Sequence, residues 1–150
     1  HWAGSAAARS IAKMAGDAPL LERAEKCVRR SEELIEKCFS EKKSAYGQAI
    51  GSDELDASLL QMISLGYFHD KPKDKAVAHL RAIQKELEIR PGYFLRYKHV
   101  DDFGEQHSAF LVCSFWFIES LIYLDFVDEA RELFEIVLKA RNHVGLVSEG

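Results

Sequence analysis

The sequence lacks the features that identify several large classes of protein. Its three cysteines, Cys27, Cys38 and Cys113, form no CxxC pair, so neither a disulfide framework nor a standard zinc motif is indicated. The 20 Lys and Arg residues form no basic block, which argues against nucleic acid as a partner. The longest apolar stretch, residues 109–124, contains polar residues and is shorter than the roughly 20 residues of a membrane span. No membrane partner is therefore expected.

Cysteine usage also bears on location. Each cysteine falls on an apolar position of a helical pattern, so all three are predicted to be small buried hydrophobic residues. An odd number without framework spacing favours a reducing compartment, and no signal peptide is visible, so a cytoplasmic location is expected. The helical pattern already begins at Trp2, which suggests that further residues precede His1.

What the sequence does contain is helical periodicity. Apolar residues recur at three- to four-residue spacing in six segments, and strand patterns are weak. The expected helices cover residues 2–15, 17–38, 53–66, 74–87, 107–124 and 127–141. Gly16 is predicted to end the first helix and Asp17 to cap the second, with Pro19 in its first turn. Residues 46–50 and 93–97 are predicted to form short extended or hairpin segments.

The links between these helices alternate in length. The links from the first helix to the second, the third to the fourth and the fifth to the sixth are mostly short. The other links, at residues 40–53 and 89–106, are long and polar, and the tail after residue 142 begins a third. Three αα-hairpins with all their long loops at one end predict half of an all-α, double-layered (α/α)6 barrel.

The fifth helix is apolar nearly all round, which indicates packing on both sides. It is therefore assigned to an inner ring with the first and third helices, while the amphipathic second, fourth and sixth form an outer ring. A solenoid of TPR or HEAT type would share the hairpin pattern. The three hairpins share no repeated signature residues, however, so the barrel is favoured.

The long loops precede the inner helices and would meet at one mouth of the barrel. They carry many carboxylates, several aromatic rings and Arg96. Aromatic rings can stack on sugar faces, while carboxylates and arginine bind hydroxyl groups. Glycoside hydrolysis also needs two carboxyl groups flanking the bond, one that protonates the leaving oxygen and one that activates water or attacks. A carbohydrate substrate is therefore the favoured partner.

Four segments resemble glycoside hydrolase family 15, the glucoamylases and related trehalases. They are residues 51–60, 109–116 with Phe-Leu-Val-Cys-Ser-Phe-Trp, 128–134, and 144–149 with Leu-Val-Ser-Glu. The resemblance is close from residue 51 to 149 and loose before that. It implies that residues 1–150 are one partial domain, the C-terminal half of a catalytic (α/α)6 barrel that acts on α-glucosides without a cofactor.

The resemblance also implies roles for individual residues. Glu149 matches the general base and Arg96 matches a substrate-binding arginine. The family's general acid lies in a Trp-Glu motif, which this sequence lacks. The family is inverting, which implies catalytic carboxyl groups roughly 6.5–9.5 Å apart.

Three further residues are candidate sugar ligands by their position in the loops: Asp53, Glu105 and His107. Each has a plainer alternative, since Asp53 and its neighbour Asp56 could equally cap a helix, and Glu105 and His107 flank the expected start of the fifth helix. The cluster of His99, Asp101, Asp102 and His107 has no standard ligand spacing, so no metal site is predicted.

Two alternatives to an active enzyme remain. The hairpins could form a non-catalytic scaffold that binds protein partners. A half-barrel would also expose the flanks of its inner helices, and large exposed apolar patches promote association, so self-association or domain swapping is expected.

Overall fold

The computed structural model describes residues 1–100, 102 and 104–148, and it consists mainly of helices. The helices are α1 (Trp2–Ala15), α2 (Ala18–Glu36), the 3₁₀ helix η1 (Ala57–Leu60), α3 (Gln61–Ser64), α4 (Lys73–Leu87), α5 (Leu111–Tyr123) and α6 (Val127–Leu138). Two short antiparallel hairpins pair β1 (Phe39–Ser40) with β2 (Ala45–Tyr46) and β3 (Glu88–Arg90) with β4 (Tyr93–Phe94).

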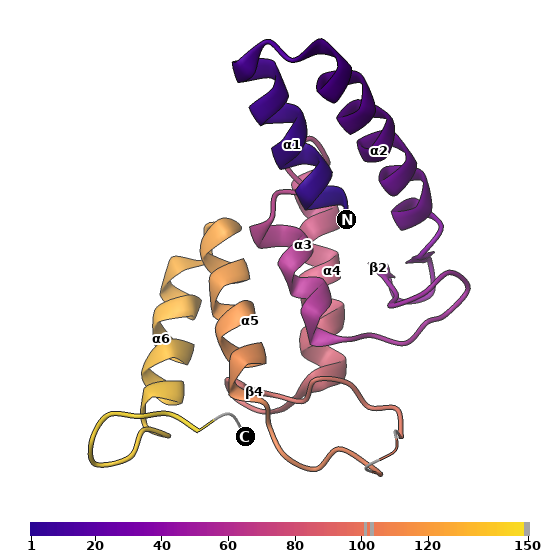
Figure 1. Cartoon of the computed structure of the whole chain (residues 1–150). Coiled ribbons are helices and arrows are strands. Elements are labelled where there is room, and N and C mark those ends of the chain that lie inside the picture. Colours follow the sequence, from indigo (N-terminus) through magenta and orange to yellow (C-terminus); the bar gives the residue numbers. More distant parts are fainter. Residues whose placement is uncertain (101, 103, 149–150) are drawn as a thin grey trace.

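The helices form three consecutive hairpins, as the alternating links predicted. Figure 1 shows α1 with α2, the η1–α3 segment with α4, and α5 with α6, while both β-hairpins and the C-terminal tail lie toward the opposite end from the short turns. Local signals set the first hairpin: Gly16 ends α1 at φ 68°, and the Asp17 carboxylate caps α2 by accepting the Leu20 N–H at 2.9 Å. The all-α, three-hairpin prediction is confirmed.

The core lies between the second and third hairpins. Helix α5 packs against α3, η1, α6 and β4, so it is surrounded by more elements than the other helices. Phe117 of α5 is fully buried and stacks on Phe94 of β4, with ring centroids 4.5 Å apart. On the outer layer, Arg81 of α4 makes a two-pronged ion pair with Glu129 of α6, both N–O distances being 2.6 Å. The inner position of α5 follows from its apolar surface.

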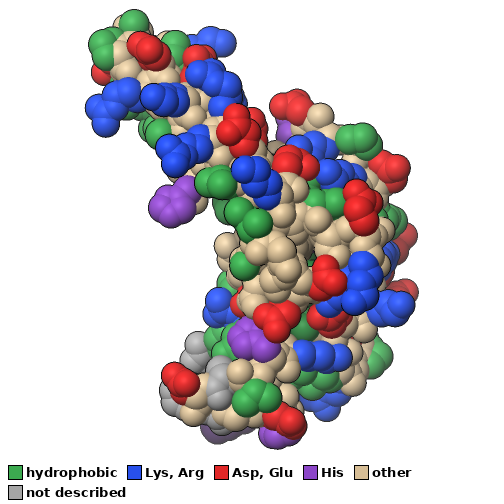
Figure 2. Space-filling view, turned by 90° about the vertical axis from the view of Figure 1, so that its right-hand side faces the viewer, with side chains coloured by type: hydrophobic (Ala, Val, Ile, Leu, Met, Phe, Trp, Pro, Cys, Tyr) green, Lys and Arg blue, Asp and Glu red, His purple; other side chains and the backbone are tan. Residues whose placement is uncertain are grey.

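The first hairpin attaches to this body through its lower end. Figure 2 shows it rising as an arm from the rest of the molecule, and Met14 near its tip is 87% exposed. Helix α1 packs chiefly on α2 rather than beside α3, which differs from its predicted position in the inner ring. It contacts the rest of the molecule near Trp2, whose ring meets the Tyr67 ring edge-on, with centroids 5.2 Å apart.

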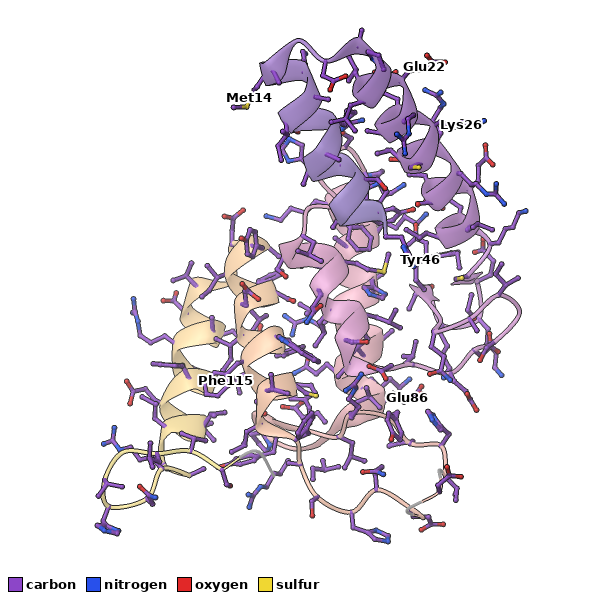
Figure 3. All side chains as sticks on the ribbon, in the orientation of Figure 1. Met14, Glu22, Lys26, Tyr46, Glu86 and Phe115 are labelled. Carbon is purple, nitrogen blue, oxygen red and sulfur yellow. The ribbon has the colours of Figure 1, made fainter. Side chains whose placement is uncertain are left out.

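A cluster around Glu36, which we call the Glu36 cluster, fixes this attachment. The Glu36 carboxylate accepts hydrogen bonds from four side chains: Tyr46, Tyr67, Lys71 and Lys75. Figure 3 shows Tyr46 between the lower end of the arm and α4. Partial burial raises the pKa of Glu36, but the lysine and tyrosine donors outweigh it and lower the pKa from 4.5 to about 2.

Glu36→Gln is expected to lower the free energy of unfolding by about 1 kcal/mol, a modest loss because the carboxylate is 41% exposed and its ion pairs are screened. Because the folded pKa is below the unfolded value, the contribution is complete above about pH 4.5 and is lost as the pH falls toward 2. Urea unfolding at pH 7 and pH 3 measures both effects. Glu33→Gln, an exposed glutamate one turn earlier, is the control. An equal loss in both variants would contradict a specific role of the cluster.

Two helix starts differ from the sequence prediction. The third helix does not begin at Ser52 or Asp53, because the Gln48 N–H donates to the Glu54 carbonyl and holds this segment as a loop. The helical turn begins only at Ala57. The fifth helix does not begin at His107, because the Phe110 N–H donates to the Phe94 carbonyl and keeps the chain extended up to Phe110.

The first long loop depends on Gly47. Its N–H donates to the Cys38 carbonyl at 2.8 Å, and a Cβ on residue 47 would collide with the Ser52 carbonyl oxygen. Gly47→Ala is therefore expected to lower the free energy of unfolding by about 2 kcal/mol. Gly4→Ala, at a helical position where a Cβ meets nothing, should instead raise it slightly. Thermal melts of both variants test this, and a neutral Gly47→Ala would show that the loop can shift.

The prediction that all three cysteines are buried is confirmed for Cys113 and wrong for Cys27. Cys113 on α5 is fully buried, Cys38 is half-buried, and Cys27 on α2 is exposed. Helix α1 covers the face of α2 that carries Ala24 and Val28, which leaves Cys27 outside. In the part of the chain that the structure describes, no helix is long and apolar enough to cross a membrane.

One apolar surface remains open. Phe115, Trp116 and Ile122 of α5 line a groove of about 730 Å³ together with Val127 and Phe134 of α6. Figure 3 marks Phe115 between these helices. The expected packing of α5 on all sides is therefore incomplete, since Ile122 and Tyr123 are more than half exposed.

Candidate functional site

An ion pair joins the two long loops at the mouth. Both carboxylate oxygens of Asp56 lie 3.3 Å from Nε of Arg96. The Asp56 side chain is only 14% exposed, whereas Arg96 is 43% exposed. Arg96 is thus anchored from the protein side while its guanidinium stays accessible to a ligand.

The same residues are joined through the backbone. The Ala57 N–H donates to the Arg96 carbonyl at 2.8 Å, and Asp56 Oδ1 accepts the Ser58 N–H at 2.7 Å, which caps η1. Asp56 is therefore a helix cap, one of the two roles that the sequence allowed, and also the partner of Arg96. Their charges act on the buried thiol of Cys113, whose pKa burial raises to about 12, with Arg96 lowering it and Asp56 raising it. Helix η1, which Asp56 caps, packs on α5.

A buried histidine connects two backbone segments next to this ion pair. His79 of α4 is fully buried, and its Nδ1 lies 3.2 Å from the Tyr46 backbone nitrogen. Nδ1 must accept that N–H, so Nε2 carries the proton and donates to the Leu59 carbonyl at 3.1 Å. Burial lowers the pKa of His79 to about 4, although the Leu59 hydrogen bond opposes the shift. A neutral imidazole therefore joins β2 to η1, the helix that Asp56 caps.

Asp53 lies elsewhere in the first loop. Its carboxylate accepts the Ser40 hydroxyl at 2.6 Å and lies 3.4 Å from the Lys42 ammonium. These contacts, chiefly the Ser40 hydrogen bond, lower the pKa of Asp53. It does not cap the third helix, and among the described residues no hydrogen bond or ion pair links it to Arg96. Its sugar-binding role stays a prediction.

Glu105 and His107 lie together in the second loop. His107 Nε2 is 4.0 Å from Glu105 Oε2, and both side chains are more than two-thirds exposed. Neither caps α5, which begins at Leu111 without a side-chain cap. His107 also lines a cavity of about 440 Å³ with Tyr93 and Ser148, so the second loop and the C-terminal tail meet there. Among the described residues, no hydrogen bond or ion pair joins either residue to the Asp56–Arg96 pair.

Other features bear on the remaining predictions. Glu149 and Asp101 lie outside the described residues. Ser148, the residue before Glu149, lines the same cavity as His107. His99 stacks on Tyr97 with ring centroids 4.1 Å apart, a contact that no sequence pattern indicated. Among the described residues, no group of three or more His, Cys, Asp or Glu side chains could hold a metal ion.

A hairpin bundle with a polar mouth is the arrangement found in helical-barrel glycosidases. The structure is similar to a solved structure described as a wild-type glycosidase, with a TM-score of 0.74 and 18% identity, over 89% of this chain and 35% of that one. This likeness concerns the fold. The family model of the glycosyl hydrolases family 15 matches residues 2–146, and the chain belongs to that family.

Curated relatives agree with this assignment. The chain is 35% identical over 149 residues to a trehalase of Thermoplasma volcanium, covering 99% of this chain and 24% of that protein. It is 31% identical over 117 residues to a trehalase of Thermoplasma acidophilum, covering 78% of this chain and 20% of that protein. It is also 31% identical over 113 residues to a trehalase of Mycolicibacterium smegmatis, covering 73% of this chain and 16% of that protein. The chain therefore spans about a quarter or less of the length of these relatives.

The family match extends the resemblance at one end of the chain. It includes the first fifty residues, which resembled the family only loosely by their motifs. It ends at residue 146, three positions before Glu149. The assignment of Glu149 therefore depends on the Leu-Val-Ser-Glu sequence rather than on this match.

Proposed function

We propose that this chain is the C-terminal half of the catalytic barrel of an inverting glycoside hydrolase that releases glucose from α-glucosides. The observation that carries the proposal is the Asp56–Arg96 pair, which holds an accessible guanidinium at the mouth of a family 15 hairpin bundle. Starch-derived oligosaccharides and trehalose are the candidate substrates, and the trehalase names of the relatives favour trehalose.

In this proposal Glu149 deprotonates the attacking water, and Arg96 hydrogen-bonds hydroxyls of the glucose that is released. An inverting reaction needs a second carboxyl group as the acid, at roughly 6.5–9.5 Å from the base. This sequence has no Trp-Glu motif, so the acid would come from another part of the protein. Glu105 and His107, beside the cavity that Ser148 also lines, would contact the sugar more peripherally. Asp53 would do so from the first loop.

The stereochemistry of the product tests this proposal. The whole protein that contains this chain is mixed with trehalose, maltose or isomaltose, and the first glucose released is observed by proton NMR. A single displacement inverts only the anomeric carbon that is attacked. Trehalose should therefore release one β-glucose and, as the leaving group, one α-glucose, and the glucose freed from the non-reducing end of maltose or isomaltose should first appear as β-glucose. Initial release of α-glucose alone from trehalose would contradict inversion. No glucose from any of the three sugars would favour the binding scaffold instead.

We also propose that the 150-residue chain by itself associates with a second copy through the α5–α6 groove. Support comes from the exposed apolar side chains there, including Phe134 and Ile122. Sedimentation velocity should detect dimers that Phe134→Glu abolishes, whereas a monodisperse monomer would contradict the proposal. A cytoplasmic location is the accompanying proposal, supported by three unpaired cysteines.

A further inference from the structure

Asp56 holds the guanidinium of Arg96 through Nε. Nε donates to Asp56, while no residue in the described ranges accepts a hydrogen bond from Nη1 or Nη2. A guanidinium has five N–H donors in one plane. Within the described residues the two Nη groups thus have no acceptor, and the side chain is 43% exposed, so a ligand can approach the fork.

Asp56 fixes the direction of that fork. Its carboxylate is itself anchored by the Ser58 N–H, and the Arg96 carbonyl is bound by the Ala57 N–H. Both the backbone and the side chain of Arg96 are thus tied to the start of η1. A fork held in this way loses less conformational freedom when it binds a ligand.

Asp56 also sets the charge of the site. It places one negative charge 3.3 Å from Nε, so the pair is neutral as a whole. Such a pair offers strong N–H donors without a net positive charge. Neutral hydroxyl oxygens can accept from these donors, whereas a phosphate group gains most from an arginine whose charge is not already compensated.

We propose that Asp56 is a positioning and specificity-determining residue, which aims the Arg96 fork at neutral sugars and disfavours phosphorylated ones. This inference rests on the proposed role of Arg96 in sugar binding. Asp56 acts through Arg96 and does not itself contact the sugar.

The Asp56→Asn substitution tests the charge of Asp56 apart from its role as a helix cap. Asparagine keeps an acceptor for the Ser58 N–H and removes the negative charge. We expect the Kd for trehalose and glucose to rise about tenfold, because the neutral amide oxygen that remains holds the Arg96 Nε–H more weakly than the carboxylate does. We expect the Kd for glucose 6-phosphate and inorganic phosphate to fall about tenfold, because Arg96 becomes uncompensated. Titration calorimetry of the whole protein that contains this chain, in a Glu149→Gln background so that trehalose is not consumed, measures all four ligands.

A spectroscopic readout tests the positioning independently of any sugar. The Arg96 Nε–H resonance, identified by its loss in Arg96→Lys, should be protected from solvent exchange in the native protein and less protected in Asp56→Asn. Glu129→Gln is the matched control, because it breaks the Arg81 ion pair on the outer helices and should leave all four affinities unchanged.

The outcomes are distinct. Unchanged phosphate affinity and an unchanged Arg96 Nε–H resonance in Asp56→Asn would overturn the inference. Tighter phosphate binding by a chain that binds no neutral sugar would support the charge role and contradict the proposed function. If circular dichroism shows that Asp56→Asn is unfolded, Asp56→Glu replaces it. This variant keeps the charge and changes the reach, so it should weaken trehalose binding without improving phosphate binding, and any gain for phosphate would overturn the inference.

Discussion

In the whole protein, Glu149→Gln is expected to lower kcat for trehalose hydrolysis about a thousandfold, within the range that general bases contribute. An amide cannot take a proton from the attacking water, yet it has nearly the shape of the carboxylate. KM should therefore change little, because Arg96 still binds the sugar. Steady-state kinetics from initial glucose release, together with the anomer observed by NMR, give both values.

The matched control for this variant is Glu132→Gln, which changes an exposed glutamate on α6 in the same way. It should leave kcat unchanged. Azide attacks the anomeric carbon without needing a base, so azide-dependent formation of β-glucosyl azide by Glu149→Ala, with glucose as the leaving group, would support the assignment. A kcat that changes less than about fivefold would place the base elsewhere, since loss of a true base costs far more.

The second large effect is expected from His79. Replacing His79 with leucine removes the acceptor of the Tyr46 N–H and the donor to the Leu59 carbonyl. The Tyr46 N–H would then be buried without a partner, whereas the Leu59 carbonyl keeps the Gln61 N–H. A buried unpaired N–H costs about 1–3 kcal/mol, so the free energy of unfolding should fall by about 2 kcal/mol. Urea unfolding followed by circular dichroism at pH 7.5 measures this change.

His79 also predicts a pH dependence. Its folded pKa of about 4 lies below the unfolded value of 6.5, so the unfolded chain binds more protons between these values. The stability is complete above about pH 6.5 and is lost as the pH falls toward 4. With about 1.4 kcal/mol for each pKa unit, the loss over this range is about 3 kcal/mol.

His79→Leu should lack this part of the pH profile. The exposed histidine at position 69 provides the control, because His69→Gln should follow the native profile. A native chain whose stability is flat from pH 7 to 4.5, or a leucine variant with an unchanged profile, would show that His79 is not buried in the neutral form.

Several features of the fold follow from local sequence. Gly16 ends α1 because it adopts positive φ without a steric penalty, and Asp17 caps α2 because it lies next to the first unpaired N–H groups. The inner position of α5 was also predictable, since a helix that is apolar nearly all round must pack on several sides. These signals act within a turn or along one helix.

Other features depend on contacts between distant residues. The starts of η1 and α5 were mispredicted because two groups that could have entered a helix have partners elsewhere. The Glu54 carbonyl accepts the Gln48 N–H, and the Phe110 N–H donates to the Phe94 carbonyl. The exposure of Cys27 depended on which face of α2 is covered by α1. A periodic pattern identifies an apolar face, but not how much of that face a neighbour covers.

The same distinction between local sequence signals and long-range contacts applies to the candidate site. Sequence motifs by themselves determined the family, the hairpin order and the identity of Arg96 and Glu149 as candidates. Only the tertiary structure decided that Arg96 pairs with Asp56, that Asp53 pairs with Ser40, and that Glu105 lies beside His107. Asp56 and Arg96 are 40 positions apart, and so are brought together by the packing of two loops on α5. Spacing along a chain encodes neighbours on one helix, whereas such long-range pairs arise only when the chain is folded.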